Sequence, residues 1–325
     1  MDAASHPRFA KSFLGFLSGT ALLMLLRFLS GTVRFPVAVI PALNVLLAIS
    51  FLAIPIVSIA LAARAPWRPA HAFGLVAFGV AVQGFGIYAT LHTGGVARVA
   101  AMSLGQGALQ LWCVGLGALV ATLVRERNIL IPIAIFLAVF DLFLVLTPAG
   151  ITQRVMKAAP QILSNVGHAV PQALPQQRPD EPEPPRPEVT AYIGPADFVF
   201  LGAYFIALAR FGMRLKETVR WMVPTLAAYL AFVLSTNIAL PALLPIGAVT
   251  LLVNRREFRL TRDEWASTGV VVALGLALLA WGATRPRAPR DEPSSPPTAP
   301  ERPASRTTPA PTASGPRPSA TPAAR

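Results

Sequence analysis

Two aspartates lie inside apolar stretches of the sequence, where a charged side chain is unusual. Asp141 interrupts the run Ile129–Leu146, and Asp197 lies just inside the next long run, at 191–211. A carboxylate in a bilayer-spanning helix costs about 2.5–3.5 kcal/mol on insertion scales, so such a residue indicates a functional site. The other acidic residues fall in loops, in tails or at the ends of apolar segments. We therefore interpret Asp141 and Asp197 as a candidate pair.

The spacing allows the two carboxyls to lie at the same depth in a membrane. A single loop joins the C-terminal half of the first segment to the start of the second, so both acids lie toward the same membrane face. With the rise per residue of an α-helix, Asp141 is about 10 Å from the end of its segment. Asp197 follows Gly194 and Pro195, a typical helix start.

Two carboxyls a few ångströms apart can perform general acid–base chemistry. They cannot easily both ionise, so one keeps a proton while the other is free to accept one. Such a pair can deprotonate a water molecule and protonate a leaving amine, as aspartic proteases do. Other roles stay open: Asp197 could stabilise the start of its helix, and Asp141 could hydrogen-bond in a packed bundle. A proton-coupled transporter or channel would also pair carboxylates inside a membrane.

Other hydrolytic chemistries have no pattern in this sequence. There is no His-Glu-x-x-His motif, and no Gly-x-Ser-x-Gly motif or Ser/His pair inside an apolar segment. The four histidines are scattered through loops and segment ends: His6, His71, His92 and His168. We therefore expect neither a metal nor a cofactor.

The composition predicts a membrane protein. The chain has 325 residues, of which 54% are hydrophobic and 13% charged, and this is more apolar than a typical soluble domain. About 20 residues of helix cross a bilayer. The sequence thus predicts an all-α, polytopic transmembrane helical bundle of about nine spans in a bacterial or archaeal membrane. The expected spans are 12–32, 36–63, 72–92, 101–124, 129–148, 191–211, 218–237, 239–253 and 267–283.

These segments divide the chain into four regions. They are a four-helix membrane region at 1–128, a membrane core at 129–253 with a large loop at 150–190, one extra span at 254–284, and a Pro-rich tail at 285–325. Within the loop, the apolar spacing over 154–174 predicts an amphipathic helix at the membrane surface. The Pro- and acid-rich part that follows is expected to be extended, and the tail to be disordered.

The net charge of +13 follows from arginines in short loops and in the tail. Basic residues concentrate on the cytoplasmic side of membrane proteins, so this charge does not indicate nucleic-acid binding. The N-terminus and the loops after the second, fourth, sixth and eighth spans hold most of the short-loop basic residues. They are therefore expected in the cytoplasm, and the acid pair and the large loop on the outer side.

A Pro-Ala-Leu run opens the eighth segment, at 241–243. Pro241 and Pro245 each lack an N–H group, so nearby carbonyls lose their intrahelical partners. Unpaired backbone close to an acid pair could hold an extended peptide by strand-like hydrogen bonds.

The chain resembles the presenilin and signal peptide peptidase family over about 129–253. Phe-Asp-Leu at 140–142, with the Leu-Thr-Pro-Ala-Gly that follows, is similar to the Tyr-Asp helix of presenilins. Gly-Pro-Ala-Asp-Phe at 194–198 is similar to the family's Gly-x-Gly-Asp-Phe segment, and Pro-Ala-Leu at 241–243 matches the family motif. The order also agrees: an Asp helix, a large loop, an Asp helix, one more span, then Pro-Ala-Leu.

This resemblance implies a presenilin-like catalytic core that cleaves transmembrane helical proteins or peptides within the lipid bilayer, without a metal or cofactor. Asp141 and Asp197 would be the catalytic dyad. The residues expected to bind substrate are Gly194, Pro241, Ala242 and Leu243. Ala196 stands where the family has glycine, and Phe140 where it has tyrosine, so a catalytically inactive presenilin-like binding protein is a further alternative.

Overall fold

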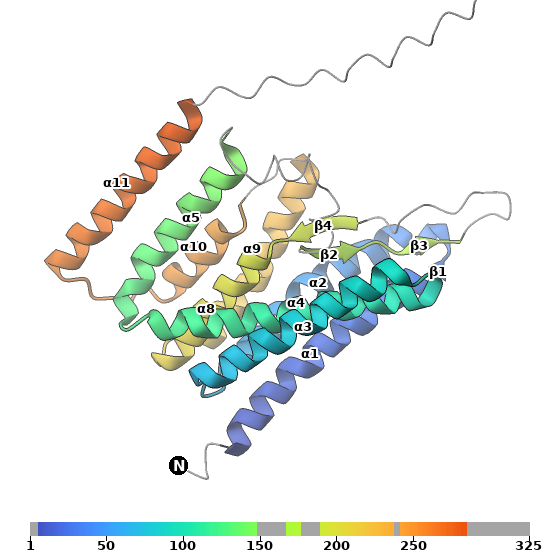
Figure 1. Cartoon of the computed structure of the whole chain (residues 1–325). Helices are drawn as coiled ribbons and strands as arrows, with labels where there is room; N and C mark the ends of the chain where they lie inside the picture. Colours follow the sequence, from blue (N-terminus) through green and yellow to red (C-terminus); the bar gives the residue numbers. More distant parts are fainter. Residues whose placement is uncertain (1–5, 148–166, 177–188, 237–240, 285–325) are drawn as a thin grey trace, which may run out of the picture. The chain divides into compact units, whose positions relative to one another are not determined.

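The computed structural model describes residues 6–147, 167–176, 189–236 and 241–284, and these ranges hold nine α-helices (Figure 1). The helices are α1 (His6–Thr32), α2 (Ile40–Ala62), α3 (Pro69–His92), α4 (Gly95–Leu123), α5 (Leu130–Leu146), α8 (Pro195–Arg210), α9 (Leu215–Thr236), α10 (Leu243–Val253) and α11 (Arg262–Thr284). Two short 3-10 helices, η1 (Val37–Val39) and η2 (Arg127–Ile129), precede α2 and α5. Each of the nine apolar segments expected from the sequence therefore contains a helix.

Seven of these helices are long and apolar enough to cross a membrane, which indicates a multi-pass membrane protein. The other two, α8 and α10, have 16 and 11 residues. At 1.5 Å per residue both are shorter than the roughly 30 Å hydrocarbon core of a bilayer. They are short because α8 begins only at Pro195, after a β-strand, and α10 begins only after Pro241.

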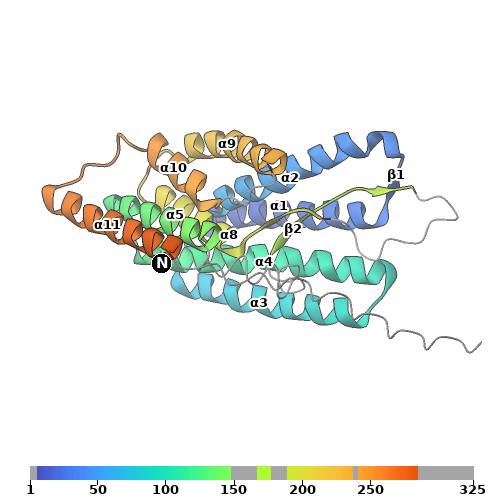
Figure 2. The ribbon, with the colours of Figure 1, turned by 90° about the horizontal axis from the view of Figure 1, so that it is seen from above.

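Helix α4 lies at the centre of the contacts, packed against α1, α3 and α8 (Figure 2). Small residues allow this close packing, as expected for helices in lipid. A methyl group at Gly117 of α4 would lie 2.5 Å from the carbonyl oxygen of Val199 and 2.9 Å from the nitrogen of Ala203, both in the α8 backbone. The buried core cluster to which α4 and α8 both contribute includes Ile59, Leu109, Val114, Phe205 and Leu208.

The segment that carries Asp141 packs in a second group of helices. Helix α5 contacts α10 and α11, and α10 in turn contacts α9. At the contact between α5 and α10, a methyl group at Gly247 would lie 3.5 Å from the Ala134 side chain and 3.5 Å from its carbonyl oxygen. The two helices therefore lie close together next to the Pro-Ala-Leu run.

Two small β-sheets add to the all-α fold expected from the sequence. Strand β2 (His168–Pro171) pairs antiparallel with β4 (Val189–Ile193), and β1 (Arg34–Phe35) pairs in parallel with β3 (Leu174–Pro175). The prediction of an amphipathic helix over 154–174 is therefore wrong at 168–171 and at residue 174, which belong to strands. Residues 154–166 lie outside the described residues.

Polar side chains from the helices explain why this segment is extended. Gln106 of α4 accepts a hydrogen bond from the N–H of Ala169 at 3.1 Å and donates one to the carbonyl of Gly167 at 2.9 Å. The Arg27 guanidinium donates to the carbonyl of Ala169, and Asn44 accepts from the N–H of Ala173 at 2.8 Å. These bonds satisfy backbone groups that a helix would otherwise have to pair internally.

The basic connections between helices lie at one end of the bundle. The ring of Phe13, near the start of α1, is 6.4 Å from that of Trp67, between α2 and α3. The N–H of Arg214, between α8 and α9, donates to Asn254 Oδ1 at 2.9 Å, just after α10. Asn128, before α5, donates to the carbonyl of Arg259. The N-terminal part of α1 and the short basic loops that we expect in the cytoplasm therefore all have contacts at this end of the bundle.

Candidate functional site

Asp141 lies near the C-terminal end of α5, where its partly buried carboxylate faces α10. Its Oδ2 accepts a hydrogen bond from the N–H of Leu243 at 3.0 Å. Leu243 is the last residue of the Pro-Ala-Leu run and the first residue of α10, whose first N–H groups have no carbonyl partner within the helix. Asp141 therefore supplies the acceptor that the start of α10 needs.

Asp197 lies in the first turn of α8, also partly buried. Its Oδ2 accepts a hydrogen bond from the N–H of Gly194 at 3.0 Å, and its own N–H donates to the Gly194 carbonyl at 3.1 Å. This is a helix-capping arrangement, one of the alternatives that the sequence left open for this acid. It occupies one oxygen of the carboxylate.

The two carboxylates lie close enough to interact electrostatically. Tyr229 of α9 lies within electrostatic range of both. No second described residue donates a hydrogen bond to either carboxyl, so each keeps one oxygen for a further partner among the groups that the structure describes. The fold thus brings Asp141 and Asp197 into the same neighbourhood, where Tyr229 also lies.

The residues expected to bind substrate lie around this pair, but two of their backbone groups already have partners. The Tyr229 hydroxyl donates to the carbonyl of Pro241 at 2.7 Å, and the N–H of Leu243 donates to Asp141. The Pro-Ala-Leu backbone is therefore less free than the prolines suggested. Ala242 contributes to the wall of a cavity, and Gly194 contacts Asp197.

Sequence reasoning missed Tyr229, whose hydroxyl links α9 to the Pro-Ala-Leu run. The signal available was weak: it is the only tyrosine in the apolar segment Leu215–Thr236, and a buried tyrosine hydroxyl usually finds a hydrogen-bond partner.

A cavity of about 160 Å³ opens beside Asp197. Its walls are mostly apolar and come from α2, α8, α9, α10 and the strands β2 and β4, and they include Phe51, Phe198, Ala242 and Ile246. A protein cavity of about 150 Å³ can hold benzene, so this space is large enough for an apolar side chain of a bound peptide.

Ala196 and Phe140, the two residues that differ from the presenilin pattern, both lie at exposed positions. Ala196 is exposed in the first turn of α8, and a helical backbone accepts alanine without strain. Phe140 is exposed on α5 and its ring stacks on that of Phe136, with centroids 5.8 Å apart. Among the described residues, neither the Ala196 nor the Phe140 side chain makes a contact that would bring it between the two carboxylates.

His168 of β2 lies behind the cavity, between two of its aromatic walls. Its ring is 5.7 Å from that of Phe51 and 5.2 Å from that of Phe198, measured between centroids. Neither ring nitrogen has a hydrogen-bond partner among the described residues. Burial lowers the pKa of His168 well below its usual value, and the positive charge of Arg27 lowers this pKa further.

Within the described ranges, no group of three or more His, Cys, Asp or Glu side chains is placed to hold a metal ion. Comparisons with protein-family models, with curated proteins and with solved structures found no match for this chain. The functional interpretation therefore depends on the geometry of this site.

Proposed function

We propose that this chain is an intramembrane aspartyl protease that hydrolyses peptide bonds of transmembrane helical substrates with Asp141 and Asp197. The observation that carries the proposal is the placement of two carboxylates from two different helices within electrostatic range of each other, beside a cavity and the Pro-Ala-Leu run. Charged side chains inside membrane proteins are rare unless they serve a function.

The reaction needs one protonated and one ionised carboxyl. The ionised carboxylate removes a proton from water as the water oxygen bonds to the scissile carbonyl carbon, and the protonated carboxyl gives its proton to the carbonyl oxygen. The carboxyl that took the proton from water then gives it to the amide nitrogen as the C–N bond breaks. The other carboxylate takes a hydroxyl proton from the intermediate, which leaves a carboxylic acid and an amine and restores the pair. The acid and base roles belong to the pair, because two such close carboxyls titrate together.

The fold offers a means of presenting an extended substrate to this pair. Strand β4 ends directly before Gly194, and its Ala191, Tyr192 and Ile193 line the cavity beside Asp197. Within the described residues β4 pairs only with β2, so its second edge can accept a peptide strand. A transmembrane helix has to unwind before its peptide bonds are accessible, and strand pairing would stabilise the unwound segment.

The test is cleavage of a single-span peptide by the purified chain in lipid vesicles, with Asp141→Asn and Asp197→Asn as variants. Asparagine keeps the size of the side chain and one acceptor oxygen, so the bonds to Leu243 and Gly194 can persist. General acid–base groups contribute about 100- to 10,000-fold to rates, and we expect each variant to lose at least about 100-fold. Asp263→Asn, at an exposed acid in α11, is the matched control and should keep full activity.

Two other results would point to different functions. Proton flux coupled to a solute, abolished by the same two substitutions and without any cleavage, would assign the pair to transport. Peptide binding without cleavage by the wild-type chain would assign it to an inactive binding protein.

A further inference from the structure

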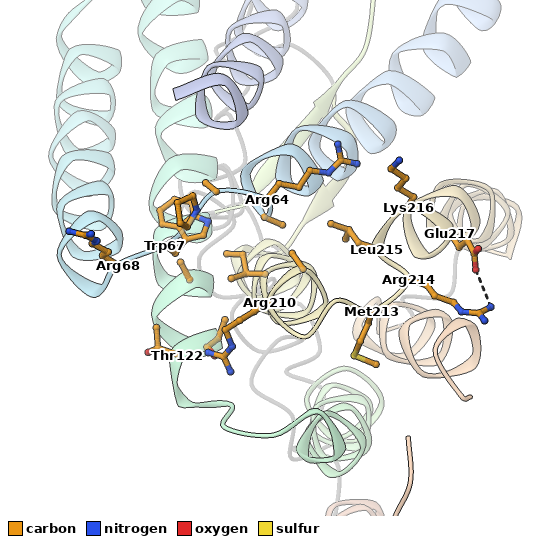
Figure 3. Close-up of a pocket in the computed structure, with 17 residues that line it drawn as sticks. Arg64, Trp67, Arg68, Thr122, Arg210, Met213, Arg214, Leu215, Lys216 and Glu217 are labelled. Carbon is orange, nitrogen blue, oxygen red and sulfur yellow. Dashed lines mark hydrogen bonds and ion pairs between the residues drawn. The ribbon is translucent and has the colours of Figure 1, made fainter. Parts of the chain in front are cut away.

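A second and larger cavity lies at the opposite end of α8 from Asp197 (Figure 3). Its volume is about 780 Å³. Three parts of the chain form it: the connection between α2 and α3 at 63–68, the end of α4 at 118–122, and the segment 206–217, which holds the end of α8, the connection that follows and the start of α9. It therefore opens at the basic end of the bundle, the end expected to face the cytoplasm.

The lining of this cavity is strongly basic. Five basic side chains and one acidic side chain contribute to it: Arg64, Arg68, Arg210, Arg214, Lys216 and Glu217. An abundance of arginine is expected on the cytoplasmic side of a membrane protein. That rule does not explain why five basic side chains line one cavity together with a single carboxylate.

Two of the five cations are engaged within the protein. Arg210 donates hydrogen bonds to the carbonyls of Ala121, at 2.9 Å, and Val124, at the C-terminal end of α4. Arg214 forms ion pairs with Glu217 at 3.3 Å and with Glu257 at 3.5 Å. The only acid in the lining is thus already used.

The other three cations have no such partner. In the part of the chain that the structure describes, the side chains of Arg64, Arg68 and Lys216 form no ion pair or hydrogen bond, and all three are exposed. They come from two parts of the chain far apart in the sequence. In Figure 3 the side chains of Arg64 and Lys216 extend toward one another, whereas Arg68 lies on the far side of Trp67. They are available to an anion.

The interior of the cavity is apolar below these cations. The buried lining residues are all apolar, and they include Ala63, Ala118, Ala121, Ile206, Met213 and Leu215. Trp67 stands at the wall, where its indole N–H donates to the carbonyl of Ala62 at 2.9 Å. Tryptophan with one polar and one apolar side is typical of the membrane interface. The cavity therefore combines an apolar floor with unpaired cations.

We propose that this cavity binds an anionic phosphate ester, the headgroup of a phospholipid in the cytoplasmic leaflet, with Arg64 and Lys216 as the residues that contact the phosphate. Arginine and lysine are the side chains that bind phosphate groups, and basic pockets between transmembrane helices bind anionic lipid headgroups. The apolar floor suits the glycerol and first acyl carbons. The proposal does not depend on the proposed protease activity.

The test is native mass spectrometry of the full chain in detergent, with phosphatidylglycerol and phosphatidylcholine of identical acyl chains. We expect the wild-type protein to retain phosphatidylglycerol preferentially. In Arg64→Gln/Lys216→Gln we expect its affinity to fall about 25-fold, since a cation near a lipid surface contributes about 1 kcal/mol, which is about five-fold. Arg68→Gln alone, on the far side of Trp67, should lower the affinity less than Arg64→Gln alone, for which we expect a fall of about five-fold.

The matched control is Arg255→Gln/Arg256→Gln, which removes two exposed cations after α10 that do not line the cavity. The control should bind phosphatidylglycerol as the wild type does. Equal losses in the control and in the cavity variant would overturn the proposal, as would equal retention of the two lipids by the wild type.

A free phosphate ester is the second source of the same chemistry. Glycerol 3-phosphate, titrated into lipid-free protein, should leave the melting temperature unchanged if the ligand is a lipid headgroup. A rise in melting temperature in the wild type, absent in Arg64→Gln/Lys216→Gln, would assign the cavity to a soluble phosphate ester. If neither phosphatidylglycerol nor glycerol 3-phosphate distinguishes these two proteins, the cavity does not bind phosphate.

Discussion

At the scale of single residues, each acid of the pair has two partners of different kinds. One oxygen of each carboxylate accepts a backbone N–H, from Leu243 or Gly194, and the other carboxylate lies within electrostatic range. The backbone bonds fix where each side chain points, while the second oxygen stays available. This arrangement suits a group that has both to hold its position and to exchange a proton.

Tyr229→Phe tests whether the hydroxyl positions the Pro-Ala-Leu run. The substitution removes the hydrogen bond to the Pro241 carbonyl and leaves the ring in place. We expect peptide cleavage to fall about 10-fold, and the free energy of unfolding to fall by about 1 kcal/mol, the usual contribution of one hydrogen bond. Tyr88→Phe, on the exposed face of α3, is the control, and an equal effect on cleavage in both variants would contradict the role of Tyr229.

His168 should make the folded state sensitive to acid. Its pKa is lowered in the folded protein by burial and by the charge of Arg27, whereas in the unfolded chain it is about 6.5. As the pH falls below about 6.5, the unfolded state binds the proton more readily, so the free energy of unfolding decreases by up to about 1.4 kcal/mol per pH unit. The contribution is fully present above about pH 6.5.

This dependence is measurable as the melting temperature in detergent between about pH 7.5 and about pH 5. His168→Phe, which keeps a ring between Phe51 and Phe198, should flatten the curve. His92→Gln, at an exposed position of α3, should leave it unchanged. A slope that persists in His168→Phe would show that other groups cause it.

At the scale of elements, the contact between α4 and α8 holds Asp197 at its depth. Gly117→Ala would place a methyl group 2.5 Å from the Val199 carbonyl oxygen, so α8 has to move. We expect a loss of stability of about 1–3 kcal/mol, the usual cost of overpacking, together with lower cleavage. At Gly84 of α3 nothing lies within 4 Å of an added methyl group, so Gly84→Ala is the control and should not lower the melting temperature. Equal stability of the two variants would contradict this packing argument.

The elements also show what could be predicted from the sequence. Apolar length alone located the nine helices of the described ranges, because each depends on a run of residues that is local in the chain. The strands were missed because they depend on distant partners: Gln106, Asn44 and Arg27 pair the backbone of 167–173 from three separate helices. The acid pair could be predicted since both residues stand out in their own segments, whereas Tyr229 gains meaning only from its contact with Pro241.

At the scale of the whole molecule, the basic connections share one end of the bundle, and the two carboxylates lie at the other ends of α5 and α8. We therefore expect a reporter inserted after Arg256 to read as cytoplasmic and one inserted after Gln176 to read as external. The measurement is labelling of single cysteines at these positions, in a Cys113→Ser background, with a thiol reagent that does not cross membranes. Labelling of the position after Arg256 from outside intact cells would reverse the assignment.

The hydrogen bond from Leu243 to Asp141 has a consequence for how substrate and enzyme would meet. A peptide that pairs with the Pro-Ala-Leu backbone has to compete for the same N–H, so its arrival would release the acid from its resting partner. Under the proposed function, occupancy of the site and reactivity of Asp141 would thereby be linked through one shared donor, and the chain without substrate would stay inactive.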